Sequence, residues 1–347
     1  MKEYVKLVDK LRRERRLEAY EMKHILRDTN VQHMAYLNHI AKEVARNQFG
    51  ANIFVRGLIE MTNRCRNDCY YCGIRKSNPN LHRYYLTESE ILACAKQGYE
   101  AGIRTFVLQG GEDSYYTDER LGVVISYLKT RFPDCAVTLS FGERSLQSYQ
   151  ALYAAGADRY LLREETGSSE HYAKLHPKSM SYENRIQCLY NLKEIGYQTG
   201  CGFLVGSPYQ TLDTILQDLQ LIQQLEPHMI GIGPFIPQKD TPFADCKPGS
   251  TILTLTILSI LRLMNPHVLL PATTALNTLL PNGRERGICA GANVVMPNLS
   301  PMYVREHYQL YNNKHYTKEE AVEGMSVLKR QMESIGYDVV IDRGDYA

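Results

Sequence analysis

Three cysteines lie close together in the segment Cys65-Arg-Asn-Asp-Cys69-Tyr-Tyr-Cys72. This spacing lets one loop wrap three thiolates around a compact centre of a soft metal. A structural zinc ion normally takes a fourth ligand from the protein, but the next histidine along the chain is His82. Three thiolates therefore suit a four-iron cluster with one iron left open to a chelating ligand. The alternative on these residues alone is a zinc knuckle that borrows a distant ligand.

The composition indicates a large globular protein. The chain has 347 residues, 44% of them apolar, which excludes a disordered chain. Its 40 Lys and Arg nearly balance 38 Asp and Glu, which argues against a general nucleic-acid binder. The most apolar stretch, 251–264, is too short to span a membrane and contains an arginine, so it is predicted to be a buried helix.

The amino terminus carries charges from the start and lacks the apolar core of a signal peptide, so we expect a cytoplasmic protein. We therefore do not expect its nine cysteines to form a disulfide framework. The six cysteines outside the triad are scattered, and Cys135 and Cys201 are expected to be buried structural thiols.

Short β-rich runs recur about every 34 residues and alternate with amphipathic segments, which is the length of a βα unit. The runs are 55–62, 105–109, 136–140, 159–163, 198–205, 229–234, 268–274 and 293–297. Eight such units predict an α/β fold, a (β/α)8 TIM barrel, with its site at the carboxyl ends of the strands. An open doubly wound sheet is the alternative. We expect N-terminal helices over 1–50, the barrel over 51–300 and a closing segment over 301–347, helical from Lys318 to Ile335.

The cysteine segment, placed after the first predicted strand, resembles the radical S-adenosylmethionine (SAM) enzymes. In that family a CxxxCxΦC loop holds a [4Fe–4S] cluster, and the amine and carboxylate of SAM bind its fourth iron. One electron from the reduced cluster breaks the sulfonium bond and yields a 5′-deoxyadenosyl radical. The resemblance implies that Cys65, Cys69 and Cys72 are the metal ligands and the catalytic centre, that Tyr71 lies near the adenine, and that ferredoxin or flavodoxin donates the electron.

Polar residues at the ends of later strands extend the resemblance. Gly110, Gly111 and Glu112 resemble the family's GGE motif, whose glycines let backbone approach a ligand closely and whose carboxylate accepts from the SAM ammonium. Seen alone, these residues would equally suit an ordinary strand-to-helix turn.

Further cofactor-binding residues follow by the same resemblance. Ser140 and Arg185 are expected at the SAM carboxylate, Arg163 near the methionine moiety and Glu165 at the ribose hydroxyls. For Arg185 the alternative is an ordinary arginine on a helix surface.

Longer blocks over residues 55–311, such as 107–113, 156–163 and 231–237, resemble the [FeFe]-hydrogenase maturases of the HydE family. The resemblance implies a step in assembling the di-iron part of the H-cluster, on a small cysteine-bound iron carbonyl cyanide complex and alongside other hydrogenase maturases. The residues expected to line the substrate cavity are Thr138, Arg159, Thr273, Thr274, Met296 and Tyr308. For the threonines and the tyrosine, backbone bonding and core packing are the alternatives.

Two other functions stay open at this point. One is a radical isomerase of an amino acid, of the methylornithine synthase type. The other is a zinc-stapled barrel without catalytic activity that acts as an assembly scaffold. Some HydE proteins carry three further cysteines near the carboxyl terminus for a second cluster, but residues 314–332 contain none, so we expect one cluster only.

Overall fold

The computed structural model describes residues 2–314 and 321–346. Six parallel strands form its central sheet in the order β2-β3-β4-β5-β6-β8. Their bounds are β2 Gly57–Thr62, β3 Thr105–Gly110, β4 Ala136–Ser140, β5 Arg159–Leu161, β6 Gln198–Cys201 and β8 Met229–Ile230. The chain belongs to the TIM-barrel class that the strand spacing predicts.

Two further segments close the sheet into a ring. Met229 forms a parallel bridge to Leu269, and Pro271 forms one to Val294 of β10 (Val294–Val295). Leu58 of β2 then bridges Asn298. The amide of Leu58 donates to the carbonyl of Pro297 at 2.9 Å, and the carbonyl of Leu58 accepts from Leu299 at 2.7 Å, so the last predicted run returns to the first strand.

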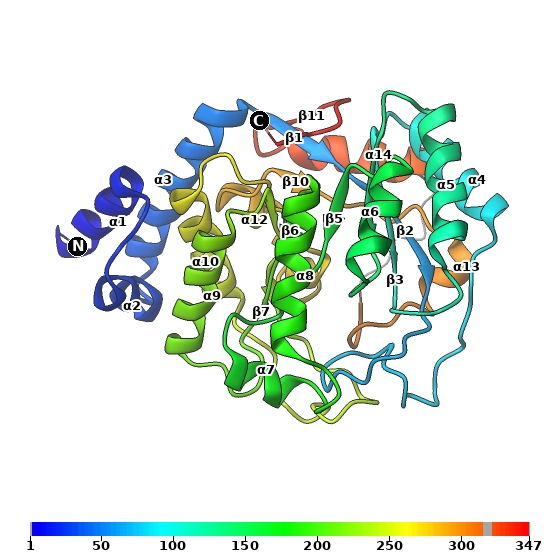
Figure 1. The fold of residues 1–347 in the computed structure, drawn as a ribbon. Helices are drawn as coiled ribbons and strands as arrows, with labels where there is room; N and C mark the ends of the chain where they lie inside the picture. Colours follow the sequence, from blue (N-terminus) through cyan, green and yellow to red (C-terminus); the bar gives the residue numbers. More distant parts are fainter. Residues whose placement is uncertain (1, 315–320, 347) are drawn as a thin grey trace.

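Helices follow the strands and cover the ring (Figure 1). They are α4 Glu88–Glu100, α5 Asp118–Arg131, α6 Leu146–Ala154, α7 Ser169–Leu175, α8 Tyr182–Ile195, α9 Leu212–Leu225, α10 Thr251–Met264, α11 Thr274–Leu279 and α12 Gly283–Cys289. A capping box begins α4, because the side chains of Thr87 and Glu90 each accept from the other's backbone amide.

Several predicted strands are divided. The first run is β1 (Asn52–Val55) and β2, because β1 pairs with β10 and β11 (Asp338–Val339) whereas β2 pairs with β3. The run 198–205 divides into β6 and β7 (Leu204–Val205), and the run 229–234 into β8 and β9 (Gly233–Pro234). Gly202, at the first division, has φ +155° and packs so closely that an added Cβ would lie 2.0 Å from the carbonyl oxygen of Gly231.

The run 268–274 is not a continuous strand. Its residues form only single bridges, and Thr273 is the N-cap of α11, so Thr273 and Thr274 begin a helix instead of ending a strand. This difference corrects the predicted secondary structure at two of the candidate substrate residues.

The amino-terminal helices α1 (Lys2–Glu14), α2 (Ala19–Arg27) and α3 (Val31–Phe49) pack on the outside of the barrel, against α9, α10 and α12. The apolar segment 251–264 is helix α10, as predicted. Its Arg262 is fully buried and donates to the carbonyls of Pro266, Val268 and Gly291 and to Asn293. No helix of residues 2–314 and 321–346 is long and apolar enough to cross a membrane.

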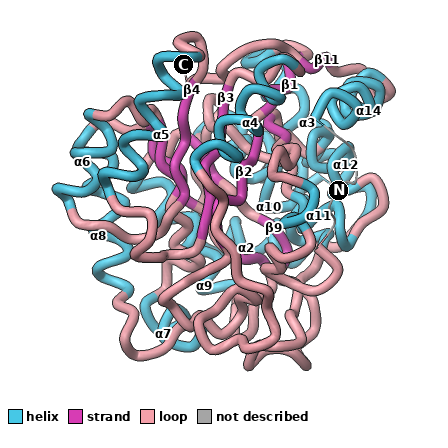
Figure 2. Tube along the Cα trace, turned by 90° about the vertical axis from the view of Figure 1, so that its right-hand side faces the viewer, coloured by secondary structure: helices cyan, strands magenta, loops and turns pink. Residues whose placement is uncertain are grey.

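The segment that follows the barrel lies against both ends of the barrel. Residues 306–314, after α13 (Met302–Arg305), lie beside the cysteine loop, because the amide of Gly73 donates to Leu310 at 2.8 Å. Helix α14 (Ala321–Glu333) and β11 lie at the opposite end with β1 (Figure 1). The predicted helix start at Lys318 lies outside the described residues. Figure 2 shows long loops gathered at the end opposite β11, where the strands end.

Candidate active site

The three cysteines lie in the long loop between β2 and α4, at the carboxyl end of β2. Arg83 holds this loop in shape by donating to the carbonyls of Asn63 at 2.6 Å, Ile74 at 2.8 Å and Arg75 at 2.6 Å. Asp68, between the first two cysteines, accepts two hydrogen bonds from Arg75 at 2.7 and 2.5 Å. The loop is thus fixed by charged residues that the cysteine spacing itself does not reveal.

The thiols are partly covered by a second loop, which follows α7. The sulfur of Met180 lies 3.8 Å from that of Cys69, and the amide of Tyr70 donates to the carbonyl of Leu175 at 2.9 Å. Burial raises the pKa of the Cys72 thiol to about 12 and raises that of Cys69 as well. These thiols therefore need a bound cation to become thiolates at neutral pH, which fits a cationic iron–sulfur cluster.

Within the part of the chain that the structure describes, no three His, Cys, Asp or Glu side chains are grouped so that they could hold a single metal ion. In an iron–sulfur cubane each thiolate binds a different iron.

Gly111 brings the end of β3 against the cysteine loop. A Cβ at Gly111 would lie 2.2 Å from the carbonyl oxygen of Arg64 and 2.7 Å from the Cβ of Cys65. At Gly110 it would lie 2.8 Å from the ring of Phe141. The two glycines are therefore required by close packing around the loop, whatever they contact in a ligand.

Glu112, directly after the glycines, belongs to a buried charged cluster. Its carboxylate accepts from the amide of Glu143 at 2.9 Å and from Arg66 at 3.2 Å, and Arg185 approaches it to 3.7 Å. The Nε of Arg185 donates to Glu143 at 2.6 Å, and its Nη1 donates to the carbonyl of Arg163 at 2.8 Å. Arg185 is thus buried, and the alternative of an arginine on a helix surface is wrong.

Arg163 and Glu165 follow β5 at the same end of the barrel. Glu165 adopts φ +67°, a left-handed backbone conformation that is costly for a residue other than glycine. Its amide donates to the carbonyl of Gly202 at 3.0 Å, which helps hold that conformation. Arg163 Nη2 lies 3.3 Å from Glu165 Oε2, yet neither atom has a hydrogen-bond partner among the described residues, although both are buried.

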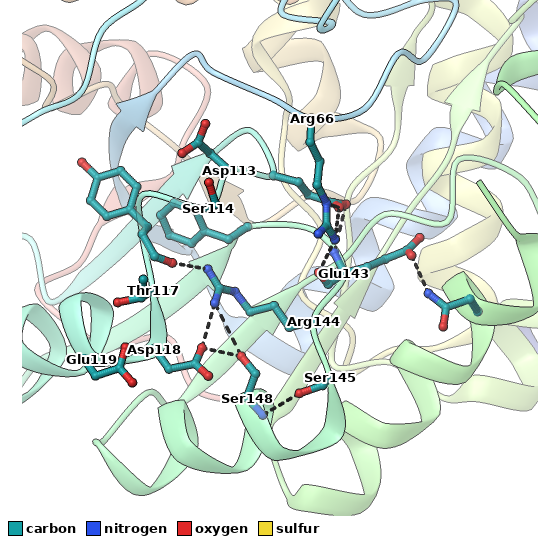
Figure 3. Close-up of a pocket in the computed structure, with 14 residues that line it drawn as sticks. Arg66, Asp113, Ser114, Thr117, Asp118, Glu119, Glu143, Arg144, Ser145 and Ser148 are labelled. Atoms are coloured by element: carbon teal, nitrogen blue, oxygen red, sulfur yellow. Dashed lines mark hydrogen bonds and ion pairs between the residues drawn. The ribbon is translucent and has the colours of Figure 1, made fainter. Parts of the chain in front are cut away.

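A cavity of about 530 Å³ lies behind this charged cluster, between the loops that follow β3 and β4. Figure 3 shows Arg66 reaching towards Glu143 on one side, and Arg144 held between Asp118 and its neighbours on the other. Glu112 and Glu143 form the wall that this cavity shares with the site.

Comparison with known proteins decides the family. The profile of the radical SAM superfamily matches residues 59–222. The [FeFe] hydrogenase maturase subunit HydE of Thermotoga maritima is 42% identical over 86% of this chain and 84% of its own length. The chain belongs to the radical SAM superfamily. It is therefore an enzyme, and a scaffold without catalytic activity is not supported.

Other relatives lie within the same superfamily. A 3-methylornithine synthase of Methanosarcina acetivorans is 29% identical over 75% of this chain and 73% of its own. The crystal structure of methylornithine synthase (PylB) aligns with a TM-score of 0.84 at 26% identity, covering 96% of this chain and 97% of that one. HydG, a maturase of the [FeFe]-hydrogenase, aligns with a TM-score of 0.81 at 19% identity, over 97% of this chain and 75% of that one, and supports the fold alone.

Membership of the radical SAM superfamily implies a [4Fe–4S] cluster and SAM, and the site fits both. Buried polar atoms without a partner among the described residues, on Arg163 and Glu165, are what a bound polar ligand would satisfy. Ser140 ends β4 at the same edge. The individual contacts of these residues with SAM remain predictions.

The predicted substrate residues fall into two groups. Arg159 begins β5, at the end of the barrel opposite the cysteine loop, and donates to Asp345 at 2.6 Å and to Thr105 at 2.9 Å. With Thr138, whose buried hydroxyl has no partner among the described residues, it lines a narrow interior space. Their contact with a substrate stays a prediction.

The second group lies elsewhere in the barrel. The buried hydroxyl of Thr273 has no hydrogen-bond partner among the described residues, and Thr274 begins α11 next to it. Tyr308 is buried and accepts from Gln109 at 3.1 Å. Met296 packs against the buried cluster of Met229, Leu269 and Val294.

Sequence reasoning missed several residues of this region. Glu143 and Met180 come from loops, and Asp218 lies in the regular pattern of α9. His176, beside Tyr71, was not among the predicted site residues either. Their spacing carries no signal, since only the folded chain brings them to the cysteine loop and to the end of β5.

Proposed function

We propose that this enzyme holds one [4Fe–4S] cluster on Cys65, Cys69 and Cys72 and cleaves SAM reductively in the assembly of the di-iron subsite of [FeFe]-hydrogenase. The observation that carries the proposal is the 42% identity to HydE across 86% of the chain. The proposed substrate is a small cysteine-derived iron carbonyl cyanide complex, and the proposed electron donor is a ferredoxin or flavodoxin. A cluster and SAM supply the one-electron chemistry.

The chain's own residues bind and orient SAM. The Glu112 carboxylate accepts hydrogen bonds from the methionine ammonium, in place of its long contact with Arg185. Arg185 Nη2, which is 3.7 Å from Glu112, is free to reach the methionine carboxylate together with Ser140. Glu165 takes the ribose hydroxyls with the carboxylate oxygen that has no hydrogen-bond partner among the described residues. Burial raises the pKa of Glu165, and nearby Arg163 opposes this rise and favours the carboxylate.

The interior of the barrel is suited to an anionic substrate. Thr138 and Thr273 supply buried hydroxyl groups without partners among the described residues. Arg159 supplies a buried guanidinium, which would exchange its present partner Asp345 for the substrate. Met296 adds a polarisable thioether at the edge of the same interior. These groups match a small ligand that bears carboxylate and cyanide.

A second candidate is an amino-acid isomerase of the methylornithine synthase type. The observation that favours it is the TM-score of 0.84 to methylornithine synthase over nearly the whole of both chains. We place it second because the identity to that structure is 26%, against 42% to HydE.

The two functions are separated by product analysis. The reconstituted enzyme is incubated without oxygen, with SAM and reductant, and either with a synthetic cysteine-bound iron carbonyl cyanide complex or with a mixture of free amino acids. We expect conversion of the iron complex and no 3-methylornithine. The Arg159→Ala variant should retain uncoupled SAM cleavage and lose this conversion. Formation of 3-methylornithine, or no effect of Arg159→Ala, would contradict the proposal.

A further inference from the structure

Tyr71 and His176 form a buried hydrogen-bonded pair between the cysteine loop and α7. The phenol oxygen of Tyr71 lies 3.0 Å from Nε2 of His176, and the two rings meet edge to face, with centroids 5.4 Å apart and planes at 87°. His176 is the C-cap of α7 and only 2% exposed. The pair thus joins the loop that carries the metal ligands to a helix on the outer layer of the barrel.

The hydrogen bonds of His176 fix which ring nitrogen carries the proton. Nδ1 lies 3.0 Å from the carbonyl oxygen of Tyr172, which can only accept, so Nδ1 is the protonated nitrogen. Nε2 is then an acceptor, and the Tyr71 hydroxyl donates to it. Burial, together with nearby Arg185, lowers the pKa of His176 to about 3, so the ring stays neutral.

The surroundings leave the imidazole no other position. The Tyr172 ring stacks on it with centroids 3.9 Å apart and planes at 26°. The His176 amide donates to the Tyr172 carbonyl at 3.1 Å. A ring held by stacking, by its own backbone and by Nδ1 presents Nε2 in one direction only, towards Tyr71.

We infer that His176 is a positioning residue for SAM, which holds the Tyr71 ring at the orientation that receives the adenine. This inference rests on the proposed function, in which Tyr71 lies beside the adenine. An aromatic residue at this place needs only its ring to contact the adenine. The hydroxyl of this chain's tyrosine instead anchors that ring to α7, and the histidine determines its orientation.

The test is a double-mutant cycle read out by SAM affinity. The holoenzyme is reconstituted anaerobically and reduced, and SAM is titrated against the electron paramagnetic resonance signal of the cluster. The variants are Tyr71→Phe, His176→Phe, the double variant, and His176→Gln, which keeps an acceptor. Tyr197→Phe is the matched control, because its buried hydroxyl donates to the carbonyl of Tyr149 at 2.7 Å, away from the site.

We expect Tyr71→Phe and His176→Phe each to weaken SAM binding about three- to tenfold, the effect of one lost hydrogen bond. The double variant should be no weaker than the weaker single variant, His176→Gln should bind within about twofold of the native enzyme, and Tyr197→Phe should bind normally. The signal without SAM should be the same in all of them.

Normal binding by Tyr71→Phe, or effects that multiply in the double variant, would overturn the inference. Tyr71→Phe keeps the ring and the fold, so it decides the matter even if His176→Phe does not fold. A native enzyme whose signal ignores SAM would instead overturn the proposed function, which is a distinct result.

Discussion

Arg185 and Glu112 approach each other to 3.7 Å, from α8 and from the end of β3. The separation is too long for a hydrogen bond, although each residue makes close bonds to Glu143. Two buried opposite charges thus form a loose ion pair with no hydrogen bond between them. This arrangement leaves each of them able to take one end of a zwitterion such as the methionine part of SAM.

Replacement of Glu112 by glutamine tests the ammonium end of this arrangement. Glutamine keeps the size of the side chain and removes its charge. A lost charge-assisted hydrogen bond corresponds to a SAM affinity about ten- to a hundredfold weaker. Isothermal titration of SAM into the reconstituted enzyme measures it. Glu88→Gln, at an exposed position on α4, is the control, and equal affinities of the two variants would contradict the assignment of Glu112.

Gly111→Ala tests the packing of β3 against the cysteine loop. The added Cβ would lie 2.2 Å from the carbonyl oxygen of Arg64, so the loop must move and the cysteines with it. We expect iron and sulfide contents to fall at least about twofold after reconstitution. Gly122→Ala on α5 is the matched control. Its added Cβ would lie 3.9 Å from the nearest atom, so this variant should keep its full iron and sulfide content. Full iron loading of Gly111→Ala would refute the packing argument.

Two buried acids near Glu165, Glu164 and Asp218, should make the stability of the fold depend on pH. Burial raises the pKa of Asp218 to about 8, with a contribution from nearby Glu164, and burial raises that of Glu164 to about 7. Asp218 accepts from Thr166 and from the amide of Gly167, and Glu164 accepts from Gly202. His171 bonds to Thr166, and Tyr182 bonds to the carbonyl of Gly167.

The unfolded chain loses the protons of both acids near pH 4, whereas the folded chain keeps them to higher pH. Between about pH 4 and about pH 8 the folded chain therefore binds more protons than the unfolded chain. The contribution of these two acids to the free energy of unfolding falls as the pH rises through this range. Asp218→Asn, which stays neutral, should flatten the fall in Tm between about pH 5.5 and 8.5. Asp213→Asn, at an exposed position of the same helix, should leave the slope unchanged. If Tm of Asp218→Asn fell with pH as steeply as that of the native enzyme, Asp218 would already be ionised in the native fold.

Replacement of Arg262, which lies far from the site, should strongly lower the free energy of unfolding. The arginine donates to four acceptors, at 2.6 to 3.1 Å, and is fully buried in α10. Arg262→Met leaves these acceptors unpaired, and we expect a loss of about 3 kcal/mol in the free energy of unfolding. Exposed Arg131→Met should change it by less than about 0.5 kcal/mol. If Arg262→Met and the native protein had the same midpoint in urea denaturation, the structural role of Arg262 would be excluded.

The sequence predicts those parts of the barrel that follow from local patterns. The buried helix 251–264 and the strand 136–140 depend on residues a few positions apart, and both are present, as α10 and β4. The division of the strands at Gly202 depends instead on contact with Gly231 from the next strand, which no local pattern encodes. The course of residues 306–314 beside Gly73 is equally a matter of tertiary packing.

The site shows the same limit. The cysteines are detectable because their spacing within one loop is constrained by the metal. His176 and Asp218 have ordinary spacing, and they gain their roles from what the fold places opposite them, which is Tyr71 in one case and the turn at Thr166 in the other. The resemblance predicts that Arg159 contacts the substrate, but the structure pairs it with Asp345, which comes from the far end of the chain.

The most direct test of the account is electron paramagnetic resonance of the anaerobically reconstituted, reduced enzyme with and without SAM. We predict about four irons per chain, a single cluster signal whose line shape changes when SAM is added, and the loss of SAM cleavage in Cys69→Ser with the fold retained. A signal indifferent to SAM, or a colourless protein with one bound zinc, would contradict the claim that Cys65, Cys69 and Cys72 hold a cluster with one iron open to SAM.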